Sequence, residues 1–261
     1  MSDTEKQRSR LAIYTCITNG YDDLKEPRVH SDDCDYICFT DQMGCDRFRS
    51  NIWRFKLLDG EDLSPALQSR LPKILPHRYL PDYDISVWLD GSFMIHGDLA
   101  GAARQFLRRA DMALFRHAEK RASVRAEAAE CRRLGKGDPD AIRRQVAAYL
   151  RDGFPDETPL PENGIMFRRH GEKKVTDAME IWWEQLRRHS HRDQLSLLYA
   201  VWKAGFGFDM YQKKALKPFV RHLPHAASRP NAGVREPRFL RRLKLKFRQV
   251  LVLNFPALYK D

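Results

Sequence analysis

Short apolar runs recur along the chain and are separated by polar or helix-forming stretches. The predicted strands are residues 11–17, 35–41, 51–58, 83–90, 111–117 and 162–170, and a further apolar run follows at 93–95. The predicted helices are residues 64–80, 98–110 and 175–205, the last divided near Ser190. Strands that alternate with helices favour βαβ units. The pattern therefore predicts an α/β fold whose mixed, mainly parallel sheet is flanked by helices.

The 261 residues suffice for one large α/β domain with a sizeable core. We expect a flexible N-terminus at residues 1–10, a domain at 11–212 and a basic C-terminal tail at 213–261. Residues 118–152 are highly charged and helix-forming, which predicts a helical excursion laid over the sheet. Pro72 and Pro76 predict that the helix starting at Ser64 is irregular, because proline cannot continue a regular helix.

Polar residues follow several of the predicted strands. They are Thr18-Asn19, Thr40-Asp41, Asp90-Gly91-Ser92 and Arg116-His117. In open parallel sheets, ligands bind beyond the carboxyl ends of the strands, so these positions predict a binding site. Neither a Gly-x-Gly-x-x-Gly fingerprint nor a Walker loop follows the first strand, which disfavours dinucleotide and P-loop chemistry.

The net charge of +11 is unevenly distributed. Between Lys213 and Arg248 there are twelve Lys or Arg and one acid, Glu236, so this segment accounts for the whole excess (12 − 1 = 11). As a helix, residues 239–251 would place apolar side chains on one face, which favours contact with an anionic membrane surface. The same pattern also fits a strand or a core helix. No nucleic-acid partner is expected, because the chain lacks an aromatic platform or a recognisable module.

The five cysteines indicate a reducing compartment, because their odd count lacks the spacing of a disulfide framework. Cys34, Cys38 and Cys45 raise the alternative of a zinc site, but no His or Cys pair follows at finger-like spacing, which favours buried thiols. The apolar runs are too short to cross a bilayer, and residues 1–10 show no secretory signal. We expect a cytoplasmic protein that can lie at the inner face of the membrane.

Asp90 is the strongest candidate for chemistry, because it directly follows an apolar strand. A carboxylate there can hold Mg²⁺ or Mn²⁺, which take their remaining ligands from water and substrate phosphates. Gly91 would let a diphosphate approach the backbone, and Ser92 would ligate or hydrogen-bond. The simpler alternative is that these three residues form a turn at the end of the strand.

Motifs spread over residues 13–203 resemble a known family. They are YTCITNGYDDLKEP, DYICFTD, KILPHRYLPDYDISVWLDGS, FRHAEKR, QVAAYLRDGFP, LPENGIMFRRH, WWEQL and SHRDQLSLLYAVWK. In order and spacing they are similar to the GT-A glycosyltransferase-like domains of plants and bacteria, of TOD/MUCI type. The segment around Asp90 also resembles glycosyltransferase family 8, where a helix arginine precedes an aromatic-Leu-Asp motif. The resemblance implies a GT-A-like fold and a nucleotide-sugar donor.

The resemblance also implies roles for individual residues. Thr15, Thr18, Asn19 and Asp41 would line the base and ribose. Arg70 and Lys73 would face the diphosphate or hold the Asp90 loop, Asp90 would bind the metal, and Ser92 would stand nearby. Asp193 and Gln194 would contact the donor or acceptor sugar. His117 would contact the acceptor hydroxyl. Each role has a plainer alternative: Asp193 as a helix N-cap, His117 as a structural histidine, and Glu162, considered as a base, as an exposed loop acid.

One departure from the family pattern concerns the metal. The usual motif is Asp-x-Asp, and the second Asp is replaced here by Ser92. His222 and His225 are the candidates for the late metal-binding histidine of family 8. Arg70, Lys73 and His77 are alternative sources of positive charge.

The sequence thus predicts a glycosyltransferase that uses a nucleotide diphosphate sugar, with UDP as the expected nucleotide and Mn²⁺ or Mg²⁺ as cofactor. Its acceptor would be a hydroxyl of a glycan, a lipid-linked sugar or a protein. The family 8 resemblance favours retention, and inversion stays open as the alternative. The rival hypothesis is a non-catalytic nucleotide- or glycan-binding module on the same fold.

Overall fold

The computed structural model describes residues 9–58, 63–117 and 122–225. The chain divides into two compact units, residues 1–223 and 224–261, and every element named below belongs to the first unit. The predicted amphipathic segment at 239–251 lies outside the described residues. Residues 213–222 of the predicted tail do belong to the first unit, where they form η1 (Lys213–Leu216) and β9 (Val220–His222).

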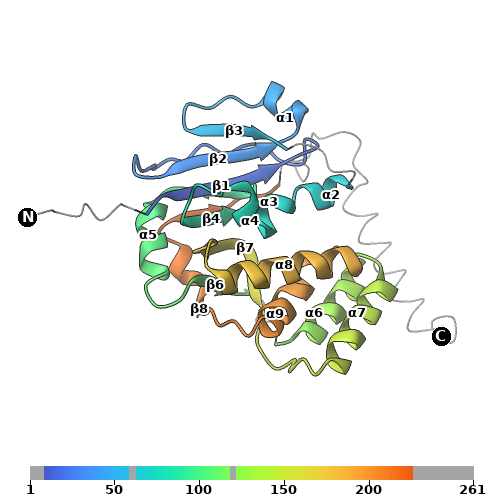
Figure 1. Ribbon diagram of the computed structural model, residues 1–261. Helices are drawn as coiled ribbons and strands as arrows, with labels where there is room; N and C mark the ends of the chain where they lie inside the picture. Colours follow the sequence, from blue (N-terminus) through green and yellow to red (C-terminus); the bar gives the residue numbers. More distant parts are fainter. Residues whose placement is uncertain (1–8, 59–62, 118–121, 226–261) are drawn as a thin grey trace, which may run out of the picture. The chain divides into compact units, whose positions relative to one another are not determined.

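The described residues form a seven-stranded sheet of order β3-β2-β1-β4-β7-β6-β8 (Figure 1). The strands are β1 (Leu11–Ile17), β2 (Asp35–Thr40), β3 (Trp53–Leu57), β4 (Ile85–Leu89), β6 (Met112–Arg116), β7 (Pro161–Arg168) and β8 (Asp209–Tyr211). β7 runs antiparallel to its neighbours β4 and β6, whereas all other pairs in this sheet are parallel. The predicted fold class, a mixed and mainly parallel sheet flanked by helices, is confirmed.

The central strands β1 and β4 are buried at every position because helices cover both faces of the sheet, whereas the edge strands β3 and β8 are partly exposed and carry charged residues. In β1, Leu11 and Ile13 point to a core that includes α5 (Leu99–Phe106). Tyr14, on the opposite face, packs in a second core with residues of α3 (Leu71–Ile74). The alternation follows from the two-residue period of a strand.

Most helices on the Tyr14 face come from two parts of the chain that are distant in sequence (Figure 1). They are α2 (Pro65–Gln68), α3, α4 (Pro76–Tyr79), α8 (Lys173–Arg188) and α9 (Asp193–Lys203). The predicted irregularity at 64–80 takes the form of three short helices, and Pro76 starts the last of them, a position that suits proline's missing N–H. Trp182 and Trp183 are buried in this core, as predicted.

The predicted helical excursion consists of α6 (Val124–Leu134) and α7 (Pro139–Arg151). These helices share a third core cluster with α9, and the partly buried Trp202 packs against it. Two further short elements lie near the sheet: α1 (Gln42–Arg47) follows β2, and β5 (Phe93–Ile95) pairs antiparallel with β9. Among the residues described, no helix has the length and apolar character that crossing a membrane requires.

Candidate active site

The carboxyl ends of β1, β2, β4 and β6 lie at one edge of the sheet, here called the rim. These strands run in the same direction, because β4 and β6 are both antiparallel to the intervening β7. The antiparallel β7 therefore contributes its beginning, near Asn163, to the same edge. The rim thus gathers polar residues from the ends of four strands and the start of a fifth, as an open-sheet binding site does.

A buried lysine links Asp90 to the start of α9. Lys73 Nζ donates to Asp90 Oδ1 at 3.2 Å and to Asp193 Oδ2 at 2.8 Å. Trp88 Nε1 donates to the same Asp90 oxygen at 2.8 Å, and the Lys73 ammonium lies 5.5 Å from the Trp88 ring centroid. Lys73 is 5% exposed, whereas the Asp90 side chain is 39% exposed. The cluster fixes one Asp90 oxygen and leaves the carboxylate open to solvent.

The electrostatics of this cluster keep Lys73 and Asp193 charged. Burial alone would lower the pKa of Lys73, but the carboxylates of Asp193 and Asp90 outweigh it and raise that pKa. Burial would raise the pKa of Asp193, but the Lys73 ammonium and the Arg70 guanidinium hold it well below its usual range. One ammonium therefore faces two carboxylates, and Arg70 contributes a further positive charge nearby.

Asp193 is not the N-cap of α9. Arg192 occupies the cap position, where it makes no capping hydrogen bond through its side chain, and Asp193 is the first helical residue. Its carboxylate instead receives Lys73 through one oxygen and the Gln194 backbone N–H, at 3.0 Å, through the other. The capping alternative fails because the buried ammonium holds this side chain.

A second buried lysine holds the turn that follows β4. Lys25 Nζ donates to the Gly91 carbonyl at 2.6 Å, to Asp22 Oδ1 at 2.7 Å and to the Asp23 carbonyl at 3.0 Å. The side chains of Lys25 and Asp22 are 7% and 3% exposed. Lys25 is not among the residues predicted from the sequence, although its position in the polar loop after the first predicted strand indicates a place near the rim.

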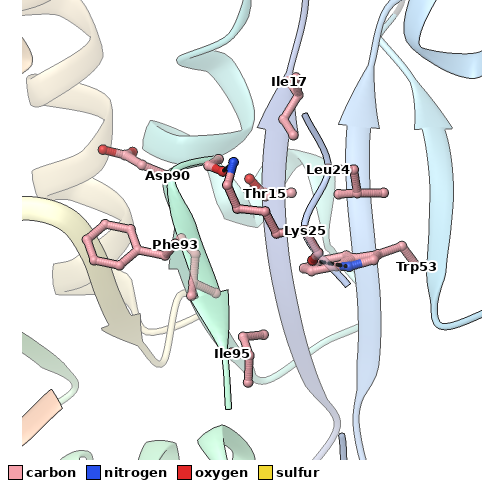
Figure 2. Close-up of a pocket in the computed structure, with 10 residues that line it drawn as sticks. Thr15, Ile17, Leu24, Lys25, Trp53, Asp90, Phe93 and Ile95 are labelled. Carbon is pink, nitrogen blue, oxygen red and sulfur yellow. Dashed lines mark hydrogen bonds between the residues drawn. The ribbon is translucent and has the colours of Figure 1, made fainter. Parts of the chain in front are cut away.

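A cavity of about 10 Å³ lies beside this turn, between Thr15, Lys25 and Asp90 (Figure 2). It has room for about one water molecule and is too small for a nucleotide. Thr15 is buried, and its hydroxyl has no hydrogen-bond partner among the described residues. Figure 2 shows Asp90 and Phe93 pointing away from Lys25 and Trp53, so the turn presents different groups to its two sides.

Asn163 is another residue that the sequence analysis did not assign. It is 3% exposed, and neither its amide nitrogen nor its amide oxygen has a partner in the part of the chain that the structure describes. A buried, unpaired carboxamide is costly, which makes it a candidate ligand contact. The next residue, Gly164, accepts the Asp90 backbone N–H at 2.8 Å. A Cβ at Gly164 would meet Phe93 Cε2 at 2.9 Å and Asp90 Oδ2 at 3.4 Å.

Three of the predicted nucleotide-binding residues meet at the ends of β1 and β2. Asn19, whose φ of 54° lies in the left-handed region, donates its backbone N–H to Asp41 Oδ2 at 2.5 Å. Asp41 Oδ1 accepts the Gly44 N–H at 2.9 Å and so caps α1. Thr18 is buried, and its carbonyl accepts the Tyr21 N–H. These contacts shape the rim, and they commit both Asp41 oxygens to backbone donors.

The remaining predicted residues are spread around the rim. Ser92 is buried, and its carbonyl accepts the Leu223 N–H at 2.8 Å. The Gln194 side-chain amide donates to the Pro161 carbonyl at the start of β7. His117 follows β6. Its backbone N–H donates to the carbonyl of Leu160, the residue before β7, at 3.1 Å, and this bond fixes the position of the His117 backbone.

The β5–β9 pair brings His222 close in register to the turn. His222 pairs with Phe93, three residues after Asp90, and the two rings lie 5.1 Å apart. No group of three or more His, Cys, Asp or Glu that could hold a metal occurs among the described residues. However, the second carboxylate oxygen of Asp90, Oδ2, accepts no hydrogen bond from the described residues and could therefore bind a metal ion. This donor set fits a Mg²⁺ or Mn²⁺ that takes most of its ligands from substrate phosphates and water.

The fold and the rim define an α/β protein with a candidate site for a polar ligand at the carboxyl ends of its strands. Residues 1–225 match the family model described as TOD1/MUCI70, glycosyltransferase-like domain. The chain belongs to this family, which confirms the resemblance found in the sequence.

Two curated relatives from Arabidopsis thaliana are similar to this chain. The probable hexosyltransferase MUCI70 is 27% identical over 218 residues, which cover 73% of this chain and 37% of that protein. The alkaline ceramidase TOD1 is 24% identical over 226 residues, covering 75% and 49%. The chain thus spans half or less of either relative. The family description and the name of the first relative refer to glycosyl transfer, whereas the second relative bears the name of a different activity.

Two solved structures of glycosyltransferases align with the model. Mouse xyloside xylosyltransferase 1 in its apo form aligns with a TM-score of 0.44 and 7% identity, over 78% of this chain and 84% of that chain. The bifunctional glycosyltransferase WbbM, also in an apo structure, aligns with a TM-score of 0.41 and 9% identity, over 74% and 38%.

Proposed function

We propose that this chain binds a nucleoside diphosphate sugar, with UDP as the expected nucleotide, at the rim beside Asp90. It transfers the sugar to a hydroxyl of a glycan, a lipid-linked sugar or a protein. The observation that carries the proposal is the Asp90 carboxylate, held through one oxygen by Lys73 and Trp88 at the end of a buried strand. Membership of a glycosyltransferase-like family supports it.

In this reaction, the bond between the anomeric carbon and the diphosphate oxygen breaks, and the acceptor oxygen, losing its proton, bonds to that carbon. The negative charge that develops on the leaving diphosphate must be offset at the rim. Asp90 through Oδ2 would hold a Mn²⁺ or Mg²⁺ that supplies this positive charge when bound, with its other ligands from the substrate phosphates and water. Lys73 holds both Asp90 and Asp193 in place and keeps Asp193 ionised.

Two further residues have roles in binding. The Asn163 carboxamide and the Thr15 hydroxyl are buried groups without partners among the described residues, and ligand hydroxyls or phosphates would satisfy them. Because the cavity beside Thr15 holds about 10 Å³, donor binding requires the loops of the rim to move outward. The basic segment of residues 239–251 would bring the enzyme to an anionic membrane at the cytoplasmic face.

Calorimetry with UDP, with and without Mn²⁺, tests the donor site. Wild type is compared with Asp90→Asn and with the control Asp82→Asn, which removes an exposed carboxylate before the same strand, at its opposite end. We expect Asp90→Asn to weaken UDP binding in Mn²⁺ at least tenfold and Asp82→Asn to leave it unchanged. The absence of UDP binding to wild type in every condition would rule out the donor site.

Turnover then separates an enzyme from a binding module. A panel of UDP-sugars is incubated with glycan and lipid-linked acceptors, and release of UDP is measured. Nucleotide binding without turnover across the panel would favour the module. Ceramide hydrolysis is measured alongside, and hydrolysis by a chain that binds no nucleotide would contradict the proposal.

A further inference from the structure

A second concave site lies along the small β5–β9 sheet, outside the Asp90 cluster. It is a groove of about 580 Å³, a volume typical of ligand pockets. Its apolar lining is Phe93, Leu216 and Val220. Its polar lining is His96, Lys213, Lys214, Lys217, Arg221 and His222. We call it the η1–β9 groove, because most of its residues come from those elements and the loop between them.

The groove carries an excess of positive charge that the rest of the described chain leaves uncompensated. Lys213 forms an ion pair with Glu162 at 2.6 Å. Lys214, Lys217 and Arg221 are exposed and form no ion pair with any described residue. Three cations that face one apolar hollow favour an anionic occupant. The segment that follows, residues 226–261, is itself rich in Lys and Arg, so it does not complement the groove by charge.

The groove adjoins the proposed donor site through one shared residue. Phe93 lines both the groove and the small cavity next to Asp90. The register of the β5–β9 pair places Phe93 and His222 at the end of the groove nearest Asp90, and Ile95 and Val220 farther along. A chain-like molecule in the groove would therefore have one end at the rim.

We propose that the η1–β9 groove binds an acidic oligosaccharide, as the acceptor of the proposed transfer. The apolar faces of its sugar rings pack on Phe93, Leu216 and Val220, and its carboxylates or phosphates pair with Lys214, Lys217 and Arg221. Arginine binds such groups through two parallel hydrogen bonds, and lysine acts as a point charge. This assignment rests on the proposed function for the identity of the acceptor, but the binding itself does not require turnover.

The test measures binding of a hexameric uronic-acid oligosaccharide by calorimetry, with a neutral hexamer of glucose as the matched probe. The groove variant is Lys214→Gln/Lys217→Gln/Arg221→Gln. The control is Arg132→Gln/Lys136→Gln/Arg144→Gln, which removes three exposed charges from α6, α7 and their connection. We expect the acidic hexamer to bind wild type and the control alike and the groove variant about tenfold more weakly or worse. Binding to wild type should also weaken as salt is added.

Several results would overturn the assignment. Equal binding of the acidic hexamer to wild type and the groove variant would remove the site. Equal binding of acidic and neutral hexamers to wild type would remove its charge selectivity. A groove variant that loses UDP affinity would make the groove part of the donor site. Binding of wild type to anionic vesicles but not to the hexamer would make it a membrane contact.

The same experiment separates this inference from the proposed function. Asp90→Asn should lose UDP binding and keep the acidic hexamer, whereas the groove variant should keep UDP and raise the KM for an acidic acceptor. If UDP binds neither wild type nor any variant but the hexamer binds with the expected pattern, the proposed donor site fails and the groove stands. If UDP binds as expected and the hexamer does not bind, the groove fails alone.

Discussion

A buried cation lies near each end of β7, and the two cations have different kinds of partner. Near its beginning, at the rim, Lys73 lies between the carboxylates of Asp90 and Asp193. At its end, Arg168 is fully buried and has no carboxylate partner among the described residues; it donates to the Tyr14 hydroxyl at 2.5 Å and to Met179 Sδ at 3.3 Å. Burial lowers the pKa of Arg168 and raises that of Tyr14 to about 12.

Of these two buried cations, only the one at the rim end of β7 is paired with carboxylates in the part of the chain that the structure describes. At the rim, each charge depends on the others, so removing the lysine leaves two carboxylates facing each other in a partly desolvated site. At the far end, the cation is surrounded by neutral groups, and His170 nearby is kept neutral at ordinary pH by burial, with a pKa of about 4. Neither arrangement adds net stability compared with apolar side chains of similar volume, because burying a charge costs solvation. We therefore infer that the rim retains its charges for ligand binding.

The largest expected effect is at the rim. Lys73→Met should lower the free energy of unfolding by about 3–5 kcal/mol, because it leaves Asp90 and Asp193 without their shared ammonium. Urea unfolding at pH 7 measures this change. The control Lys173→Met breaks an exposed pair with Asp177 on α8 and should change stability by about 0.5 kcal/mol or less. Equal effects of the two substitutions would show that the rim cluster is not a coupled unit.

The next effect concerns the far end and depends on pH. The folded pKa of His170, about 4, lies below the unfolded value of about 6.5, so the unfolded state binds the extra proton first as the pH falls. Stability from this group is complete above pH 6.5 and declines by about 3 kcal/mol toward pH 4. His170→Gln should reduce the pH dependence of the free energy of unfolding between pH 6.5 and pH 4. The control His30→Gln, at an exposed position, should leave it unchanged. An unchanged slope in His170→Gln would show that the histidine is not buried neutral.

A smaller effect is expected at Lys25, on the other side of the Asp90 turn. Lys25→Met removes the ammonium that pairs with the buried Asp22 carboxylate and donates to the Gly91 carbonyl, and Asp22 Oδ1 keeps the Asp23 N–H; the change should cost about 2 kcal/mol. Because Lys25 positions the turn, UDP affinity should fall as well, which a purely structural residue elsewhere would not cause. Lys56→Met, exposed on β3, is the control for both readouts. Loss of stability with unchanged UDP affinity would contradict the positioning role.

The smallest effect is expected at Arg168. Arg168→Met removes a buried charge but also the donor to the Tyr14 hydroxyl, and the two changes oppose each other. We expect the free energy of unfolding to change by about 1 kcal/mol or less, with UDP binding retained. The double variant Arg168→Met/Tyr14→Phe removes both polar groups and should be no less stable than the single one. A loss comparable to that of Lys73→Met would erase the contrast between the two ends of β7.

The sequence was sufficient to predict β1, β2, β3, β4, β6 and β7, their mainly parallel arrangement and the polar residues at the rim, but not the short strands β8 and β9. These follow from local periodicity and from the rule that parallel strands present their carboxyl ends together. The family resemblance singled out Lys73, Asp90 and Asp193, which the structure joins in one cluster. Their contact spans 120 positions of sequence between Lys73 and Asp193, and no periodic pattern reports such a separation.

Other features could not be predicted because the signals were weak or misleading. β9 is three residues long and lies in a stretch that composition alone marks as a basic tail. Asp193 precedes an apolar helical pattern, which suggested a cap, but a buried ammonium from α3 determines its role. Asn163 occupies an ordinary strand position, and only its burial without a partner distinguishes it.

Gly164 connects the two proposed sites through the space that its missing side chain leaves. A methyl group there would crowd Phe93, which belongs to the groove, and would contact the free oxygen of Asp90. A residue larger than alanine would press on both neighbours, because a Cβ at position 164 already lies 2.9 Å from Phe93 Cε2 and 3.4 Å from Asp90 Oδ2. A single position on β7 therefore constrains how donor and acceptor sites can diverge in evolution: neither can be reshaped through residue 164 without altering the other.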